Sequence, residues 1–251
     1  MDREEALLRK RLIELSQMAF HKGIVIFSDF LNLNELHILH TTPKDLFYTE
    51  YETFGGYEMS ERQIAAFLPD ALCCASGYPI TPLEILPTAF KFAVGMSHRD
   101  YLGALVHLGI ERSKIGDILV YEKSAVVFVK REMAAFITEQ LTRIGRQSVR
   151  VKEQEEPEET YLPSCQLLTG TVASVRLDTV LAVAYPLSRS KIVPLIEGGR
   201  TFVNGKLILS NGFHLKEGDV ISVRQLGRIV YEGELSVTKK GRHLIQVKKF
   251  G

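Results

Sequence analysis

The sequence has few cysteines and no long apolar run. Its 251 residues include three cysteines, Cys73, Cys74 and Cys165, and no CxxC pair. This number and spacing exclude a disulfide framework and give no sign of a zinc site, so we expect reduced cysteines with a structural role. No stretch reaches the roughly 18 consecutive apolar residues typical of a transmembrane helix, and we expect none.

The first residues also lack the features of a secretory signal. The segment MDREEALLRKRLIEL is charged throughout and has no central apolar region. The seven histidines and the scattered acidic residues show no spacing typical of metal ligands. We therefore expect a cytoplasmic protein that binds no metal and no other cofactor.

Positive charge is distributed unevenly along the chain. The net charge is +1, and 45% hydrophobic with 24% charged residues is ordinary for a soluble globular protein. Residues 171–251, however, carry 13 Lys and Arg against 6 Asp and Glu, whereas residues 1–170 carry 18 against 24. A basic end on an acidic body is typical of a protein that binds a polyanion. A merely solvated basic face is the alternative, and charge alone leaves both open.

A linker is predicted between the two unevenly charged parts. Residues 152–163, KEQEEPEETYLP, contain five glutamates and two prolines and little that could be buried. This stretch leads us to predict an N-terminal helical or mixed domain at 1–75 and an α-β domain at 76–152. An acidic linker at 153–170 and a basic C-terminal domain at 171–251 follow. The length of the chain is sufficient for several small domains.

The pattern of residues 76–152 predicts a ferredoxin-like plait, so the fold class is α+β. Ser97 begins a helix that Asp100 helps to cap and that Gly109 ends. A second helix is expected at 132–143, stopped by Gly145. Strands are expected at 83–86, 117–121, 125–130 and 147–151. The resulting order is β-α-β-β-α-β.

Two helices are predicted in residues 1–75. Residues 4–21 have the periodicity of an amphipathic helix. Ser60 and Gln63 have the spacing of a capping box, which predicts a second helix through Phe67 to Pro69.

The C-terminal part predicts two helices followed by a hairpin. Arg176 and Asp178 open a helix whose buried face carries Leu177, Val180, Leu181 and Ala184. Residues 188–191, SRSK, start a second helix that ends at two glycines, 198 and 199. A strand is expected at 201–203. The dipeptide Asn-Gly at 204–205 is a strong signal for a two-residue hairpin, with the chain returning at 206–209. The turn at 216–219 leads into a strand at 220–224.

The start of the second helix carries two cations where acids are usual. Arg189 and Lys191 lie in the first turn, where the macrodipole and the free N–H groups favour negative charge. The same place is a natural anion site, and a bound phosphate would offset the repulsion. Side chains that simply extend into solvent are the alternative.

The motifs RLDxxL, SRSK, EGGRxxVNGK and LKEGDVI together resemble the S4 domain, an RNA-binding module. The matching residues are Arg176, Leu177, Asp178, Leu181, Ser188, Arg189, Ser190, Lys191, Gly199, Arg200, Val203, Asn204, Gly205, Lys206, Gly218 and Asp219. The resemblance implies that Arg176, Arg189, Lys191, Arg200 and Lys206 line a basic face that contacts folded RNA. Pro194 departs from the pattern, and a kink there would change the position of residues 195–197.

The rest of the chain resembles the bacterial YlmH family. The motifs that carry this resemblance are FGGY at 54–57, SHRDYLGA at 97–104, LGI at 108–110, IGDI at 115–118, GR at 227–228 and KKGR at 239–242. The resemblance implies a ribosome quality-control factor that stabilises P-site tRNA on a large subunit carrying a stalled nascent chain. The implied partners are rRNA, tRNA and the large ribosomal subunit, bound by a monomer.

Nine residues are candidates for RNA contact. They are Arg176, Ser188, Arg189, Ser190, Lys191, Arg200, Asn204, Lys206 and Arg99. Arg99 belongs to the triplet His98-Arg99-Asp100, which also occurs in protein kinases. A kinase would need an asparagine five residues after the aspartate, where this chain has Leu105, and no glycine-rich loop precedes the triplet. A helix start that leaves Arg99 free for phosphate is the better interpretation.

Two further interpretations are weighed against simple packing. Asp178 resembles the catalytic aspartate of a pseudouridine synthase, but no large catalytic β-domain follows it, and Arg176 or Arg200 could pair with it. Phe128 could stack on bases as in an RRM, but no RNP1 pattern surrounds it, which favours a core position. We therefore expect a non-catalytic RNA-binding factor. An RNA-modifying enzyme that uses the S4 module for targeting is the alternative, and residues 1–75 could in addition dock a protein.

Overall fold

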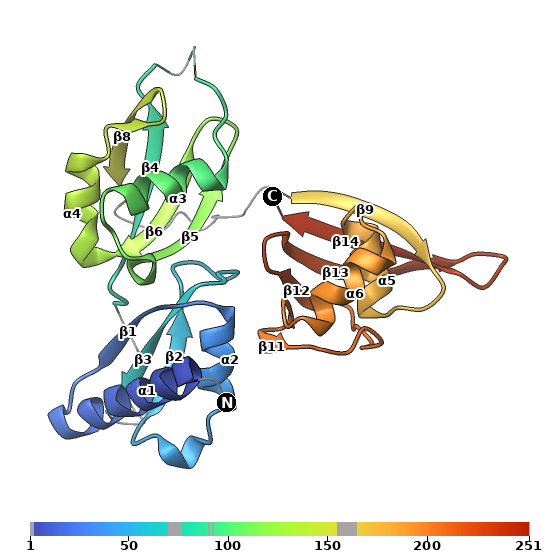
Figure 1. The fold of residues 1–251 in the computed structure, drawn as a ribbon, viewed down its shortest axis with the longest axis horizontal. Helices are drawn as coiled ribbons and strands as arrows, with labels where there is room; N and C mark the ends of the chain where they lie inside the picture. The colour runs from blue at the N-terminus through green and yellow to red at the C-terminus, as the bar shows by residue number, and fades with distance from the viewer. Residues whose placement is uncertain (1–2, 70–76, 90, 92, 155–164, 251) are drawn as a thin grey trace. The chain divides into compact units, whose positions relative to one another are not determined.

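The computed structural model describes residues 3–69, 77–89, 91, 93–154 and 165–250 (Figure 1). The chain divides into two compact units, Met1–Leu162 and Pro163–Gly251, and each is considered by itself. Cys73, Cys74 and most of the predicted acidic linker lie outside the described residues. No described helix combines the length and apolarity needed to span a bilayer.

The first unit begins with a three-stranded antiparallel sheet that carries two helices. The order of its strands is β1-β3-β2, with β3 in the centre. The helices are α1 (Arg3–Lys22) and α2 (Leu33–Thr41), and the strands are β1 (Ile26–Leu31), β2 (Glu50–Phe54) and β3 (Gln63–Leu68). Leu12, Ala19, Leu39 and Phe67 form the core between helices and sheet. The predicted helix at 4–21 is confirmed.

The predicted helix from Ser60 to Pro69 is wrong, because these residues form the central strand β3. Residues Ile64 to Leu68 are all buried, and a short continuous apolar run of this kind is typical of a strand enclosed on both faces. The apparent capping box is a local turn: the Gln63 side-chain amide donates to the carbonyl of Ser60 at 2.9 Å. The same pair of residue types therefore closes a turn without starting a helix.

The remainder of the first unit is the predicted plait. Its sheet has the antiparallel order β5-β6-β4-β8-β7, which is the order of a βαββαβ fold with one added short strand. The elements are β4 (Ile80–Pro87), α3 (His98–His107), β5 (Ile115–Val120), β6 (Ala125–Lys130), α4 (Arg131–Gln140), β7 (Arg143–Ile144) and β8 (Gln147–Glu153). Ser97 caps α3 as expected, with its hydroxyl and backbone N–H both donating to Asp100.

The second helix of the plait is shorter than predicted. It ends at Gln140, and Arg143 belongs to β7, where it pairs with Ser148. Gly145 has φ of 56°, which places it in the tight turn between β7 and β8. The glycine that appeared to stop a helix therefore makes a hairpin.

The N-terminal sheet covers part of the plait face that lies opposite the helices. Phe30 and Ile64 pack against Leu119, Val126 and Phe128 in one buried cluster. The Phe128 side chain is fully buried and stacks on Tyr57, with 5.1 Å between ring centroids. Base stacking on Phe128 is excluded by this packing, and the expected core position is confirmed.

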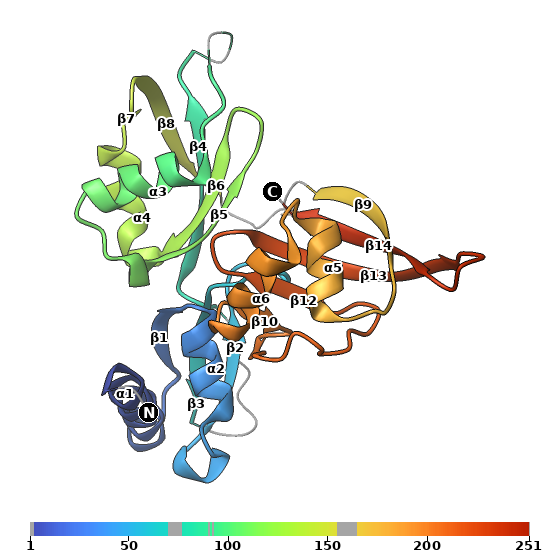
Figure 2. The ribbon, with the colours of Figure 1, turned by 45° about the vertical axis from the view of Figure 1, so that its right-hand side comes forward.

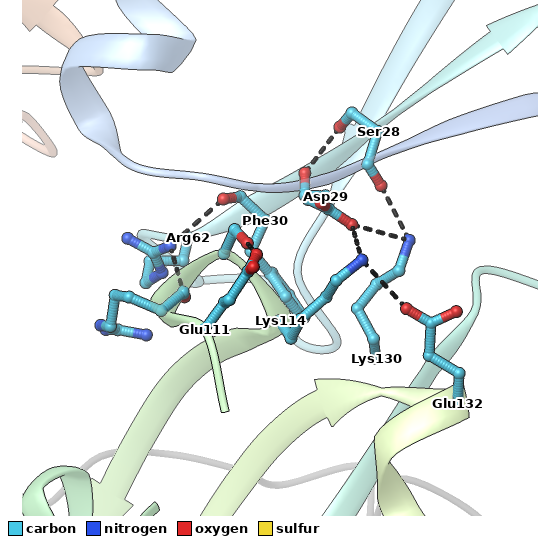
Figure 3. A network of polar contacts seen from close by, with 10 residues as sticks. Ser28, Asp29, Phe30, Arg62, Glu111, Lys114, Lys130 and Glu132 are labelled. Carbon is cyan, nitrogen blue, oxygen red and sulfur yellow. Dashed lines mark hydrogen bonds and ion pairs between the residues drawn. The ribbon is translucent and has the colours of Figure 1, made fainter. Parts of the chain in front are cut away.

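A polar network joins β1 to the plait beside this apolar cluster (Figure 3). Lys114 Nζ lies 2.9 Å from Asp29 Oδ1 and 3.0 Å from Glu132 Oε1. Lys130 Nζ donates to the carbonyl of Ser28 at 2.9 Å and lies 3.6 Å from Asp29 Oδ1. The hydrogen bond that Lys114 donates to Asp29 raises the pKa of Lys114, whereas burial lowers the pKa of Lys130. Asp29 is thus the shared anion of two lysines.

The second unit is a six-stranded antiparallel sheet with two helices on one face (Figure 2). Its strand order is β11-β10-β12-β13-β14-β9. The elements are β9 (Cys165–Val172), α5 (Leu177–Ala184), α6 (Arg189–Glu197), β10 (Thr201–Val203), β11 (Lys206–Leu207), β12 (Val220–Val223), β13 (Gly227–Val237) and β14 (His243–Phe250). Residues 165–170, which were expected to belong to the linker, are part of β9. The expected helices, strand and Asn-Gly hairpin are all present.

Both helices of this unit pack on the sheet through the predicted apolar faces. Leu177, Leu181 and Ile192 are buried against Ile229 and Ile245 in a single core. Pro194 does not break α6, which continues to Glu197, and Ile196 is fully buried after it. Pro194 itself is exposed, so its ring lies on the solvent side of the helix. The position of residues 195–197 is therefore helical.

Candidate RNA interface

The start of α6 is open to solvent and positively charged. Ser188 is the N-cap, and the side chains of Arg189, Ser190 and Lys191 are exposed. The Ser188 and Ser190 hydroxyls lie 2.8 Å apart and bond to each other. Within the described part of the chain, no group accepts a hydrogen bond from the backbone N–H of Arg189 or Ser190. These N–H donors and the exposed side chains of the two cations can together bind an anion such as phosphate.

The start of α5 is closed by the loop between β11 and β12, in contrast to the start of α6. The backbone N–H of Leu177 donates to the carbonyl of Phe213 at 2.8 Å, and that of Asp178 to the carbonyl of Asn211 at 3.2 Å. The N–H groups that an anion would need are therefore already satisfied. Only side chains of α5 and its cap can contribute to RNA binding.

A buried aspartate holds two of the candidate arginines together. The Asp178 side chain is completely buried and accepts hydrogen bonds from Arg176 Nε at 3.2 Å and Nη2 at 3.1 Å. Arg189 Nη2 approaches the same carboxylate at 2.8 Å. The side chains of Arg176 and Arg189 remain 32% and 66% exposed. Asp178 thus fixes two guanidinium groups from different helices at one place while leaving both accessible.

This geometry decides between the two partners that were open for Asp178. Arg176 is the one that pairs with it, and Arg189 is a further partner that the sequence did not indicate. The pairing joins the first turns of α5 and α6. Its two residues, Asp178 and Arg189, lie eleven positions apart in the sequence. No local spacing signal could have revealed it, because the contact depends on how the two helices pack.

Arg200 and Lys206 are exposed on the segment that follows α6. Arg200 comes directly after the two glycines that end the helix, and Gly199 has φ of 69°. Lys206 follows the hairpin turn, in which Asn204 and Gly205 have φ of 48° and 75°. Positive φ at both central residues is the backbone of a type I′ turn. The hairpin between β10 and β11 thus presents both cations to solvent.

Asn204 has a structural role within this turn. Its side-chain amide donates to Asp219 Oδ1 at 2.8 Å, and its Oδ1 accepts from the backbone N–H of Val220 at 2.9 Å. Asp219 also accepts from the N–H of Lys216 at 2.7 Å. The asparagine therefore ties the hairpin to the turn before β12, and its polar atoms are engaged inside the protein.

Arg99 belongs to the first unit, where it is exposed in the first turn of α3. The other eight candidates all lie in the second unit. Among those eight, Arg176 and Arg189 are both held by Asp178, and three further residues lie at the start of α6. The remaining three are Arg200 just before β10, Lys206 in the β10–β11 hairpin and Asn204, which has a structural role.

Comparisons with known proteins agree with this division. Residues 77–158 match a family described as “Putative RNA-binding domain in YlmH”, and residues 175–221 match the S4 domain. The chain is 32% identical to the ribosome-associated protein quality control protein P2 of Bacillus subtilis (strain 168). That alignment spans 191 residues, 75% of this chain and 73% of the relative.

A solved structure shows the same fold. The cell division protein ylmH from Streptococcus pneumoniae matches with a TM-score of 0.51 and 23% identity. The match covers 61% of this chain and 93% of the solved one. With its RNA-binding domain, its S4 domain and the extent of the similarity to the Bacillus protein, the chain belongs to the YlmH family.

Proposed function

We propose that this protein is a non-catalytic factor that binds rRNA and tRNA on the large ribosomal subunit, in the cytoplasm, during quality control of stalled nascent chains. The Bacillus relative is named for ribosome-associated quality control, and that name supports the setting. The two matched RNA-binding domains support the ligand class. The S4 unit would hold RNA through its helix pair and the β10–β11 hairpin.

The single observation that carries this proposal is the arrangement at the start of α6. Arg189 and Lys191 stand beside free backbone N–H groups, and Asp178 fixes Arg176 next to them. A phosphodiester backbone supplies negative charges that suit both the cations and the helix dipole. Contacts of this kind bind folded RNA by its phosphates and need no particular base.

A non-catalytic role is supported by the environment of Asp178. A pseudouridine synthase needs its aspartate free to reach a uridine, whereas this carboxylate is completely buried and bonded to two arginines. In this position the carboxylate orients the two arginines, and it is not placed to attack a base.

Charge reversal at α6 tests the proposal directly. We expect Arg189→Glu with Lys191→Glu to weaken binding to purified large-subunit rRNA at least about tenfold, because phosphate contacts become repulsive. The log–log salt dependence of the affinity should also become shallower by roughly 0.7 to 0.9 for each lost contact. Filter binding at several salt concentrations measures both. Lys22→Glu with Lys44→Glu, two exposed lysines of the first unit, is the control with the same charge change.

Two results would contradict the proposal. Binding of the wild-type protein to rRNA without salt dependence would exclude a phosphate interface. Sedimentation of a cell lysate through a sucrose gradient tests the ribosomal setting: we expect the protein to migrate with free large subunits. A position with free protein alone would refute that setting.

A further inference from the structure

Most of the excess positive charge of the second unit lies outside the S4 match. Residues 175–221 carry six Lys and Arg against four Asp and Glu. Residues 222–251 carry seven against two, although they form only the end of the sheet. The helix pair of the S4 domain therefore accounts for the smaller part of the asymmetry, and the larger part belongs to β13, β14 and their connection.

The far ends of these two strands and their connection form an arm at the end of the sheet, where β14 stays paired with β9 as far as His243. The strand β12 pairs with β13 only as far as Val230, so beyond Tyr231 the strand β13 pairs with β14 alone. The side chains from Glu234 to Val237 are all exposed. Figure 1 shows the hairpin extending past α5 and α6. We define residues 232–243 as the arm.

The base of the arm contains features that set its direction. The register between β13 and β14 is irregular between Tyr231 and Gly233 and again between Glu234 and Ser236. Gly233 has φ of 117°, which a side chain would disfavour. Such bulges bend a strand pair and increase its twist, and they are frequent where a hairpin must be aimed.

The tip of the arm is ordered and strongly basic. The backbone N–H of Thr238 donates to the carbonyl of Arg242, and that of Gly241 to the carbonyl of Thr238, both at 2.8 Å. Lys239, Lys240 and Arg242 are exposed, and no acidic residue occurs between positions 235 and 242. Arg242 Nη2 donates to the carbonyl of Thr171 at 2.8 Å, which holds this guanidinium in place.

The charges of the tip are not neutralised within the described part of the unit. No carboxylate there lies within ion-pair distance of Lys239, Lys240 or Arg242. The nearest acid along β13, Glu234, is instead paired with His243 at 2.7 Å. Three unpaired cations in four residues create a local positive field that a polyanion would neutralise.

We propose that the arm is a second RNA contact, in which Lys239, Lys240 and Arg242 bind phosphates of a folded RNA at a place separate from the α5–α6 face. This inference rests on the proposed function and adds a site to it. Phosphodiester is the chemistry that fits, because the three cations lie close together in the chain on a narrow hairpin and have no carboxylate partner within the described unit. A bilayer fits less well, since only Leu235 and Val237 offer apolar surface on the arm.

The test compares three double variants of the full chain. Lys239→Glu with Lys240→Glu should weaken binding to purified large-subunit rRNA about tenfold, and the salt slope should fall by roughly 0.7 to 0.9 for each lost contact. Lys239→Gln with Lys240→Gln, which removes charge without reversing it, should show a smaller loss of affinity in the same direction. The Lys22→Glu, Lys44→Glu control should bind as wild type. Far-UV circular dichroism confirms that each variant is folded.

The outcomes separate this inference from the proposed function. If Arg189→Glu with Lys191→Glu weakens binding but the arm variants bind like the control, the arm inference is overturned and the function stands. If the wild type binds rRNA without any salt dependence, the phosphate interface of the proposed function is refuted, and the arm inference that rests on it is refuted as well. If the arm variants lose affinity for phosphatidylglycerol vesicles and not for rRNA, the arm is a membrane contact and the inference is again overturned.

Discussion

Asp178 is the residue on which the geometry of the α5–α6 face depends. Its carboxylate is buried and satisfied by two guanidinium groups that come from different helices. A buried acid of this kind is strongly destabilised when its partners are lost, and the partners lose their fixed positions when the acid is removed. Stability and RNA affinity are therefore coupled at this residue.

We expect Asp178→Asn to lower both properties. The amide keeps the size of the side chain but has no charge for Arg176 and Arg189, which then repel each other. The free energy of unfolding should fall by about 2 kcal/mol, in the range of lost hydrogen bonds between charged groups. Affinity for rRNA should also fall severalfold. Urea denaturation and filter binding measure the two effects.

The exposed Glu232→Gln variant is the matched control for loss of one acid, and it should change neither property. An Asp178→Asn protein with wild-type affinity would show that the pinned arginines do not need their fixed positions to bind RNA.

The pairing of Asp178 with Arg189 was beyond the reach of the sequence. Arg189 was predicted to bind RNA from its place at a helix start, whereas its pairing with Asp178 follows only from tertiary packing. Asn204 shows the same limit: its place in the turn was predictable from the Asn-Gly pair, whereas its bond to Asp219 depends on the neighbouring turn.

At the scale of elements, the β10–β11 hairpin carries a structural residue, Asn204, close to a residue that we predict to bind RNA, Lys206. Asn204 joins the hairpin to the turn before β12. Two positions further along the chain, the side chain of Lys206 is exposed to solvent. The two roles can be distinguished by experiment, because one affects the fold and the other the charge.

We expect Asn204→Ala to lower the free energy of unfolding by about 2 kcal/mol. The change removes two hydrogen bonds and places alanine, which tolerates positive φ less well than asparagine, at a φ of 48°. Affinity of the folded protein for rRNA should stay close to wild type. Lys206→Ala should do the reverse, with unchanged stability and weaker binding. Thermal denaturation and salt-dependent filter binding distinguish them, and a large loss of affinity in folded Asn204→Ala would assign the asparagine to RNA.

Elements were predictable where local pattern and tertiary position agree. The helices α5 and α6 were found because their apolar faces repeat with helical period and their ends carry Ser188 and two glycines. The strand β3 was mistaken for a helix because its buried run has no alternation, and its turn imitates a cap. The strand β7 was missed because two residues are too short for any periodic signal.

At the scale of the whole molecule, the first unit depends on the junction between its N-terminal sheet and the plait. The apolar cluster around Phe128 and the polar network around Asp29 lie on the same side of the plait sheet. The sequence predicted separate domains at 1–75 and 76–152, but these residues form one compact unit. This packing could not be predicted from the sequence, because the apolar residues that each part buries against the other have the same pattern as residues of an ordinary domain core.

We expect Asp29→Ala to destabilise this unit and leave RNA binding by the second unit intact. Removal of the shared anion leaves the buried Lys130 with only the carbonyl of Ser28 as a partner. The free energy of unfolding should fall by about 1 to 3 kcal/mol. Urea denaturation followed by tyrosine fluorescence measures the change. Asp45→Ala, an exposed acid of the same unit, is the control.

A loss of rRNA affinity in folded Asp29→Ala would contradict the separation and would make the first unit part of the main RNA interface. Equal stability of Asp29→Ala and Asp45→Ala would show that the lysines do not need their shared anion.

The ion pairs of Arg176 and Arg189 with Asp178 also determine how much side-chain conformational entropy is lost on RNA binding. A long side chain that becomes ordered on binding costs about 0.5 to 1.5 kcal/mol of conformational entropy. Here two such side chains have already lost that freedom during folding. A larger share of each phosphate contact therefore remains as affinity, and the complex should dissociate more slowly than one formed by two unrestrained arginines.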